Sequence, residues 1–176
     1  MLPTIAREND TVVMIDQRKL PAEEVYVHCK TAAEVARAIA TMVIRGAPAI
    51  GVAAAMGIAL GMRKSKATGT QKFAAEFHKI CEMMAATRPT AVNLFWAVDR
   101  MKRSFAAAAQ AGESVDQIKD RLDREADLVH DEDGARCRAM GAFGGGPGPI
   151  GCYWDALLPG PCDLCYWSSS TDGATA

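Results

Sequence analysis

The stretch VIRGAPAIGVAAAMGIALGM, residues 43–62, places one arginine, Arg45, at the edge of a long run of small and apolar residues. Residues 46–62 carry no charge and are rich in alanine and glycine. Pro48 is well placed to open a helix, because its missing N–H costs nothing in the first turn. A run of this length lies at the lower limit of a membrane span, and its composition favours a buried helix that packs closely against its neighbours.

A small hairpin and a helix are predicted before this stretch. Residues 11–16 (TVVMID) and 24–29 (EVYVHC) have the composition of strands and are joined by a turn that contains Pro21. Thr31 and Glu34 have the spacing of a capping box. They predict a helix that ends near Arg45-Gly46, shortly before a proline.

Further helices are predicted after residue 62. Residues 70–86 carry an apolar stripe at helical spacing, and another helix should begin with Pro89 at its first position. A second capping box, at Ser114 and Gln117, opens a last helix that should reach about Met140. The predicted fold class is α+β, a small N-terminal β-hairpin followed by a helical bundle. The helix after Pro89 should face the core with Leu94, Val98, Met101 and Phe105, broadened by Val92, Phe95 and Trp96, and the last helix with Val115, Ile118, Leu122 and Val129.

The character of the chain changes after Met140. Residues 141–176 contain no Lys, Arg, His, Glu, Asn or Gln, and Gly and Pro interrupt every apolar run. Ordinary disordered tails are charged and poor in aromatic residues, unlike this one. We therefore expect residues 1–140 to form one domain, and residues 141–176 to be an atypical Gly/Pro/Cys/Trp-rich tail that is not a domain.

Charge and composition restrict the function classes. A formal net charge of −1 supplies no basic stripe, which argues against a nucleic-acid partner but allows a small anionic ligand. The first residues lack the basic flank and apolar stretch of a signal peptide, so we expect a cytoplasmic protein with no membrane partner. Cys29, Cys81 and Cys137 are isolated among apolar or helical residues, which is typical of reduced core thiols.

Arg45, Gly46 and Ala47 form a candidate anion site. A turn of small residues before a helix presents free N–H groups at the positive end of the helix dipole, and Gly46 and Ala47 would let a phosphate approach. Arg45 could add a planar, two-pronged donor. The alternative, which spacing alone favours, is an arginine in solvent that ends one helix before a buried one.

Arg88 has the same position relative to Pro89 that Arg45 has relative to Pro48. Alone it indicates an ordinary helix start, with Thr90 and Asn93 as nearby polar groups. As a pair the two arginines are more suggestive, because both could contact one anion at two helix N-termini.

Two other patterns carry weaker chemistry. Cys162-Asp-Leu-Cys165 has the spacing of a metal or redox motif, but Cys152 is the only further ligand nearby and no strand and helix flank it. We therefore expect no metal and no cofactor. Asp131-Glu132-Asp133 should be a solvated face, because adjacent side chains point around a helix instead of converging.

Two segments together, IRGAPAIGVAAAMG (44–57) and TRPTAVNLFWAVDRM (87–101), resemble the methylthioribose-1-phosphate isomerases. IDQRKLPAEEVYV (15–27) is similar to the strand-turn-strand that opens that family, and the resemblance covers residues 4–140. It implies an aldose–ketose isomerase of methionine salvage, and so of amino-acid biosynthesis. Such an enzyme converts 5-methylthioribose 1-phosphate to 5-methylthioribulose 1-phosphate without a cofactor, as a homodimer. The resemblance also implies substrate contacts at Arg45, Gly46, Ala47 and Arg88.

The same family continues into a Rossmann-like second domain, in which a cysteine of an HCNAG-like segment and a later aspartate perform the chemistry. Moving a proton between adjacent carbons needs acid and base groups of this kind. Residues 141–176 contain no such segment, so no catalytic residue is identified in this chain. We expect a truncated or frame-shifted form with little activity. The alternatives are a ribose-1,5-bisphosphate isomerase-like enzyme, a non-catalytic regulatory subunit of the translation-initiation nucleotide-exchange factor, and a fragment that acts only as an interaction module.

Overall fold

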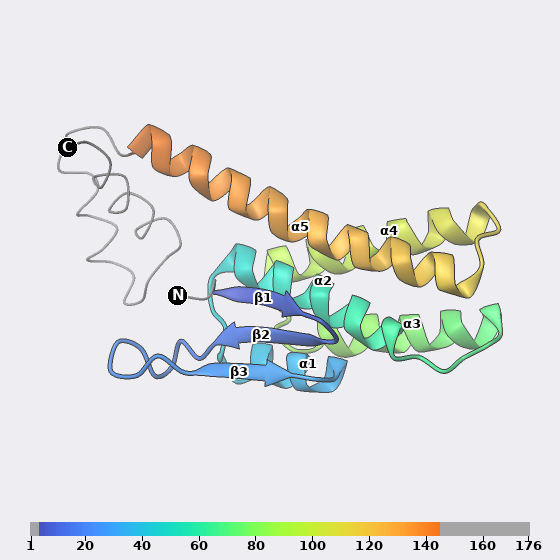
Figure 1. The fold of residues 1–176 in the computed structure, drawn as a ribbon, viewed down its shortest axis with the longest axis horizontal. Helices are drawn as coiled ribbons and strands as arrows, with labels where there is room; N and C mark the ends of the chain where they lie inside the picture. Colours follow the sequence, from blue (N-terminus) through green and yellow to red (C-terminus); the bar gives the residue numbers. More distant parts are fainter. Residues whose placement is uncertain (1–3, 145–176) are drawn as a thin grey trace.

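The computed structural model describes residues 4–144, in which a small sheet precedes five helices (Figure 1). Strands β1 (Ile5–Glu8), β2 (Thr11–Ile15) and β3 (Tyr26–Cys29) form one antiparallel sheet in that order. The helices that follow are α1 (Ala32–Ala40), α2 (Ala47–Arg63), α3 (Thr70–Ala85), α4 (Val92–Gln110) and α5 (Val115–Gly144). The predicted α+β class is confirmed.

The predicted hairpin is present, and a further strand extends it. β2 and β3 pair from Val12 opposite Cys29 to Ile15 opposite Tyr26. Asn9 adopts a φ of 52°, a left-handed conformation that asparagine tolerates better than most residues, and β1 folds back on β2 there. The sequence pattern does not reveal β1, because this short strand buries only one of its residues and so carries little apolar periodicity.

Helix α1 begins at the predicted capping box and ends earlier than predicted. Thr31 Oγ1 accepts a hydrogen bond from Glu34 N at 3.2 Å. The helix stops at Ala40 and not near Arg45, because Met42 adopts a φ of 61°. Val43 N then donates to Ala38 O at 2.9 Å, and Met42 N donates to Ile39 O at 3.2 Å. This pair of bonds is a Schellman end, which usually has glycine in the left-handed position.

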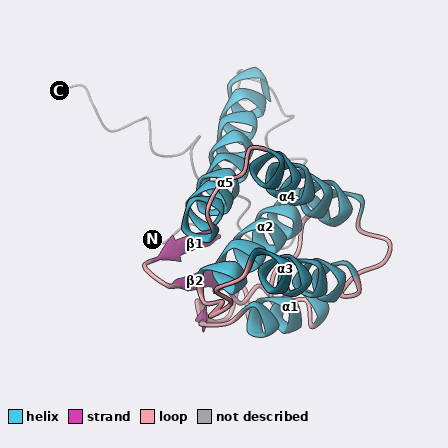
Figure 2. Ribbon diagram, turned by 90° about the vertical axis from the view of Figure 1, so that its right-hand side faces the viewer, coloured by secondary structure: helices cyan, strands magenta, loops and turns pink. Residues whose placement is uncertain are grey.

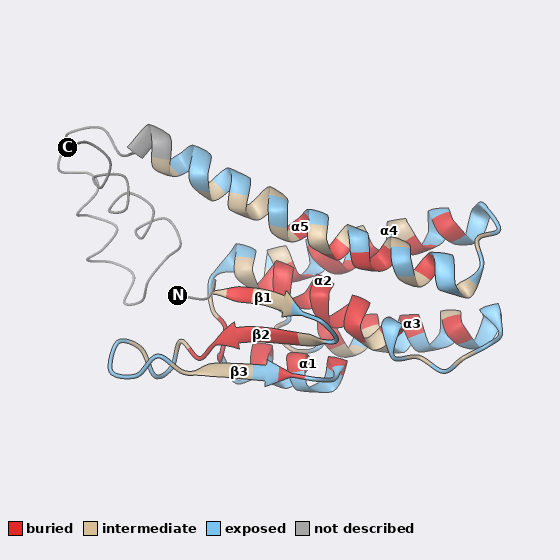
Figure 3. Cartoon of the chain, viewed as in Figure 1, coloured by how far each residue is buried: buried red, intermediate tan, exposed pale blue. Residues whose placement is uncertain are grey.

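Helix α2 is the centre of the molecule, as its small residues predict. It lies among α1, α3, α4, α5, β1 and β2 and contacts all of them (Figure 2). Residues 50–60 are all buried (Figure 3). A Cβ on Gly57 would lie 2.8 Å from Val35 Cγ1 of α1 and 2.6 Å from Met84 Cε of α3. Close packing of α1 and α3 therefore depends on glycine here. Within residues 4–144 no helix is both long and apolar enough to cross a membrane.

Helices α3 and α4 share an aromatic contact, in which the rings of Phe77 and Phe105 stack with centroids 4.2 Å apart. The prediction that Val92, Phe95 and Trp96 broaden the core face of α4 is wrong. Val92 is 78% exposed, and the other two are more than one-third exposed. Helix α4 buries a narrower face, which consists of the predicted residues Leu94, Val98, Met101 and Phe105 together with Ala97 and Ala108.

Helix α5 begins with the second predicted capping box. Ser114 N donates to Gln117 Oε1 at 2.8 Å, and Gln117 N donates to Ser114 Oγ at 3.3 Å. Its first half packs on α2 and α4, and its C-terminal turns extend past the other helices (Figure 1). Of the predicted core residues, Ile118, Leu122 and Val129 are buried and Val115 is half-buried.

Ion pairs tie the first strand to this last helix. Arg7 of β1 pairs with Asp123 of α5 at 2.8 Å and also with Asp127. Arg63, at the end of α2, pairs with the same Asp123 and with Asp120. Asp123 is only 7% exposed, so its charge is compensated by two arginines in a largely desolvated position.

Candidate functional site

Arg45, Gly46 and Ala47 lie in the turn between α1 and α2. Gly46 is the N-cap of α2 and has a φ of 94°, a left-handed value that favours glycine. Ala47 is the first helical residue and Pro48 the second. No side chain of residues 4–144 caps this helix start. Among the described residues, the first N–H groups of α2 therefore have no side-chain cap at the positive end of the helix dipole.

Arg45 is half-buried and is held by Gln17, which follows β2. The backbone N of Arg45 donates to Gln17 Oε1 at 3.0 Å, and Arg45 Nη2 donates to the main-chain O of Gln17 at 3.0 Å. Gln17 N in turn donates to Val43 O at 2.9 Å. Arg45 is therefore not a solvated arginine at the end of α1, because α1 has ended at Ala40 and the side chain is bonded to the turn that follows β2.

The turn that carries Gln17 is fixed by a buried carboxylate. Asp16 is 2% exposed, and its carboxylate accepts hydrogen bonds from Arg18 N at 3.1 Å, Arg18 Nε at 2.8 Å and Arg18 Nη2 at 2.7 Å. These bonds hold the pKa of Asp16 below its usual value. Asp16 N also donates to Val25 O at 2.7 Å, and this bond joins the two ends of the loop between β2 and β3.

Arg88 lies in the loop between α3 and α4 and is half-buried. Its main-chain O accepts a hydrogen bond from Ala91 N at 3.0 Å, which closes a turn with Pro89 in the second position, where proline is favoured. The prediction that Pro89 opens the helix is therefore wrong, and α4 begins at Val92. Among the described residues, none forms an ion pair or hydrogen bond with the Arg88 side chain.

The first turns of α2 and α4 are in contact. A Cβ on Gly51 would lie 2.9 Å from the main-chain O of Asn93. The turn that carries Arg45 and the loop that carries Arg88 thus precede two helices whose N-terminal turns lie side by side. Contact of both arginines with one anion stays a prediction.

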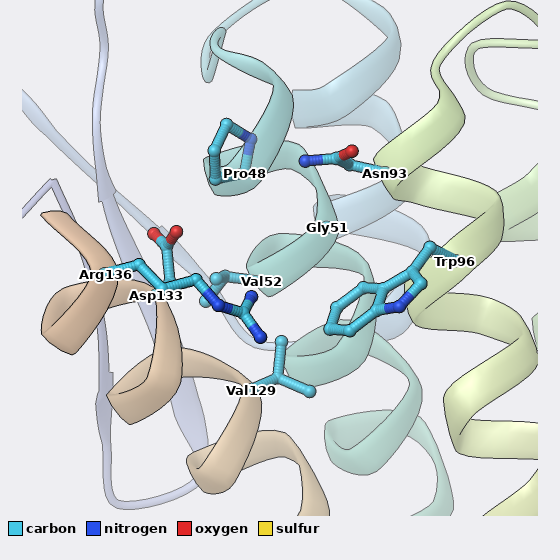
Figure 4. Close-up of a pocket in the computed structure, with 8 residues that line it drawn as sticks. All are labelled: Pro48, Gly51, Val52, Asn93, Trp96, Val129, Asp133 and Arg136. Carbon is cyan, nitrogen blue, oxygen red and sulfur yellow. The ribbon is translucent and has the colours of Figure 1, made fainter. Parts of the chain in front are cut away.

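A pocket of about 240 Å³ lies beside this contact, between α2, α4 and α5 (Figure 4). The ring of Trp96 forms one wall, and the guanidinium carbon of Arg136 lies 5.9 Å from the ring centroid. Neither Arg45 nor Arg88 lines this pocket. The sequence pattern does not reveal the pocket, because the helical spacing of Trp96 predicts a core residue. The lining residues are Pro48, Gly51, Val52, Asn93, Trp96, Val129, Asp133 and Arg136.

The acidic run 131–133 is only partly a solvated face. Asp131 is exposed, but Glu132 accepts from Arg100 Nη1 and Nη2, both at 2.7 Å, and Asp133 lines the pocket. The guanidinium group of Arg100 lowers the pKa of Glu132. As predicted, the three carboxylates point in different directions around the helix. The prediction that all three face solvent is wrong for Glu132, which joins α5 to α4 through Arg100.

Two thiols of the described residues, Cys29 and Cys81, are poor nucleophiles. Cys29 and Cys81 are buried as predicted, and burial raises their pKa to about 11 and about 12. Cys137 is half-buried on α5 and is not a core residue. Within residues 4–144 no cluster of His, Cys, Asp and Glu is arranged to hold a metal ion. Cys152, Cys162 and Cys165, and the tail from residue 145 onward, lie outside the described residues.

The model of the initiation factor 2 subunit family matches residues 43–146, which span both arginines and helices α2 to α5. The chain belongs to this family. Its fold is also that of two solved structures. The 5-methylthioribose 1-phosphate isomerase of Pyrococcus horikoshii OT3 matches with a TM-score of 0.78 and 41% identity, over 82% of this chain and 40% of that one. Subunit delta of the translation initiation factor eIF-2B from A. fulgidus matches with a TM-score of 0.75 and 36% identity, over 82% and 41%.

Among curated sequences, proteins named methylthioribose-1-phosphate isomerase are similar to this chain. The protein of Geobacter metallireducens is 50% identical over 148 residues, which are 84% of this chain and 42% of that protein. The protein of Koribacter versatilis is 50% identical over 144 residues, 82% and 40%. The chain thus spans about 40% of the length of the curated relatives it matches.

Proposed function

We propose that this chain binds the phosphate of 5-methylthioribose 1-phosphate through Arg45, Gly46, Ala47 and Arg88, as the N-terminal part of a methylthioribose-1-phosphate isomerase. The names of its relatives at about 50% identity support the substrate class. The observation that carries the proposal is the position of Arg45, a charged residue directly before Gly46, which is the N-cap of α2 and has no side chain to cap the helix. Guanidinium groups and free N–H groups at a helix start are the donors that suit a phosphate.

The role of these residues is to hold and orient the sugar phosphate. The reaction converts an aldose 1-phosphate to the corresponding ketose 1-phosphate, so a proton must move between two adjacent carbons. None of the described residues is assigned that proton transfer. We therefore expect the 176-residue chain to bind substrate and to turn it over slowly, because orientation raises the rate only when reacting groups are present.

The domain organisation belongs to the same proposal. Residues 1–140 correspond to the N-terminal domain of the isomerase, and α5 carries the regular structure on to Gly144. Residues 141–176 are then a tail that adds no domain, and the intact isomerase is a homodimer.

Titration of the chain with 5-methylthioribose 1-phosphate tests the proposal. Arg45→Ala and Arg88→Ala should each weaken binding by about tenfold or more, because each removes a charged donor to the phosphate. Arg103→Ala is the matched control, since Arg103 is exposed on α4 away from its N-terminus. Equal affinities of the wild type and both site variants would contradict the proposal.

One observation favours a second candidate, a non-catalytic subunit of the initiation-factor type. The A. fulgidus subunit matches with nearly the same TM-score as the isomerase of Pyrococcus horikoshii. A chain of that type should bind no sugar phosphate, so the titration separates the two. Ribose 1,5-bisphosphate in the same titration tests the related isomerase.

A further inference from the structure

Arg45 differs from the salt-bridged arginines of the described residues in the chemistry of its partners. The salt-bridged arginines each contact an Asp or Glu carboxylate, and they are Arg7, Arg18, Arg63, Arg100, Arg121 and Arg136. Arg45 instead contacts two neutral oxygens, both of Gln17. A neutral acceptor orients a guanidinium group without cancelling its charge, whereas a carboxylate does both.

The contacts between Gln17 and residues 43–45 fix the backbone and the side chain of Arg45 together. The bond from Gln17 N to Val43 O sets the register of the two segments. The side-chain amide oxygen of Gln17 then holds Arg45 N, and its main-chain oxygen holds Nη2. Within residues 4–144 only one of the five guanidinium donors of Arg45 is used, so the remaining donors can serve a ligand.

Gln17 is itself held in place from the other side. Its neighbours Asp16 and Arg18 are joined by three hydrogen bonds between 2.7 and 3.1 Å, and Asp16 is buried. The chain around residue 17 therefore has little freedom to move when Arg45 moves. A bond to such a support restricts Arg45 more than a bond to a freely rotating surface side chain would.

We propose that Gln17 is a positioning residue for Arg45. It holds the backbone and guanidinium group of Arg45 in a fixed arrangement and leaves the positive charge available for the substrate phosphate. The inference rests on the proposed function, in which Arg45 contacts that phosphate. Gln17 itself need not touch the ligand.

Two substitutions of Gln17 distinguish the loss of its hydrogen-bond acceptor from the effect of a negative charge beside Arg45. Gln17→Met has a similar size but no acceptor for Arg45 N. Gln17→Glu keeps the acceptor and places a carboxylate beside Arg45. Glu23→Gln is the control, because Glu23 lies in the same loop in an exposed pair with Lys19. The 176-residue chain and its variants are titrated with 5-methylthioribose 1-phosphate at a temperature where urea curves show every protein folded.

Both substitutions at residue 17 should weaken binding by about tenfold, for different reasons. Gln17→Met removes the acceptor that holds the backbone N of Arg45, and Gln17→Glu compensates the charge of Arg45. Glu23→Gln should bind like the wild type. A merely structural Gln17 predicts another pattern: Gln17→Met would lower the free energy of unfolding, but the folded protein would bind normally, and Gln17→Glu would resemble the wild type.

Hydrogen exchange of the Arg45 amide gives a readout that does not depend on any ligand. The bond to Gln17 Oε1 should protect this amide in the wild type and in Gln17→Glu. In Gln17→Met it should exchange about tenfold faster. Loss of affinity without loss of protection in Gln17→Glu would identify charge compensation as the cause.

Arg45→Ala distinguishes failure of this inference from failure of the proposed function. The proposed function is wrong if the wild type does not bind the sugar phosphate, or if Arg45→Ala binds it as well as the wild type. In either case the positioning role of Gln17 is wrong too. If Arg45→Ala loses binding while both substitutions of Gln17 retain it, the proposed function stands and the positioning role is overturned.

Discussion

Asp16 is a nearly fully buried carboxylate whose charge is matched by the adjacent Arg18, and this makes it a pH-dependent element of the turn that supports Gln17. Because its pKa in the folded state is below the unfolded value of about 3.9, its contribution is fully present above that value. The contribution is lost as the pH falls through the folded-state pKa. Asp16→Asn should therefore lower the free energy of unfolding at pH 7 by about 1–3 kcal/mol.

Urea unfolding of wild type and Asp16→Asn between pH 3 and pH 7 measures this effect. The difference in stability between the two proteins should become smaller toward the acidic end of the range. Glu23→Gln, in an exposed ion pair, should follow the wild type throughout. A stability difference that does not change with pH would show that the charge of Asp16 is not what holds the turn.

At the same scale, the sequence predicts Arg45 as a candidate but not Gln17. The candidate site at Arg45 can be recognised from four consecutive residues, an arginine followed by a glycine, an alanine and a proline. Gln17 reaches Arg45 across a separation of 28 residues, and no short-range pattern records such a contact. For the same reason the pocket beside Trp96 cannot be read from the sequence, because three helices build it.

At the scale of the elements, the glycines of α2 set how closely its neighbours approach. Gly57→Ala should lower the free energy of unfolding by about 1–3 kcal/mol, because the new methyl group would overlap the stiff side chain of Val35. Gly134→Ala is the matched control on α5, where the nearest atom to a new Cβ is Arg138 Nη1 at 3.3 Å. That change should raise stability by about 0.5–1 kcal/mol through helix propensity.

Urea unfolding of the two alanine variants checks both directions in one experiment. Opposite signs are expected. Equal effects would mean that the approach of α1 to α2 does not depend on Gly57.

The helix starts are predicted better than the helix ends. Both capping boxes have the expected N-cap bond, because a box lies within four residues and its polar side chains are diagnostic. The return bond is as expected at Ser114, whereas Glu34 accepts from Lys30 N and not from Thr31 N. The predicted end of α1 is wrong by several residues. Met42 occupies the left-handed position at the end of the helix, where a glycine would have indicated the end in the sequence. The start of α4 is displaced because Pro89 suits a turn as well as a helix, and only the bond from Ala91 N to Arg88 O decides between them.

At the scale of the whole molecule, the two buried thiols report on global unfolding. Cys29 and Cys81 are each 1% exposed or less, and their pKa values of about 11 and about 12 keep them protonated at pH 8. Iodoacetamide at pH 8, followed by site-resolved mass spectrometry, should modify both about 100-fold or more slowly than Cys137. Similar rates at the three sites would show that the core opens locally.

A chimera tests whether this part of the chain is a working half of the isomerase. Residues 1–144 would be joined to the remaining C-terminal part of the Geobacter metallireducens relative, which is 50% identical over the matched region. The chimera should convert 5-methylthioribose 1-phosphate, and Arg45→Ala in the chimera should lower kcat/KM by about 100-fold. Arg103→Ala should leave it unchanged. A folded chimera with no turnover would argue for the subunit of the initiation-factor type.

The ion pairs of Arg7 with Asp123 and Asp127 have a consequence for biosynthesis. The strand that leaves the ribosome first is fastened to a helix synthesised 120 residues later. At ordinary elongation rates that separation corresponds to roughly 6–24 s. For roughly half of this interval, after residue 63, α2 has been made but α5, which covers it, is not complete. The nascent chain therefore exposes its most apolar segment for seconds, which is the period in which a chaperone would bind it.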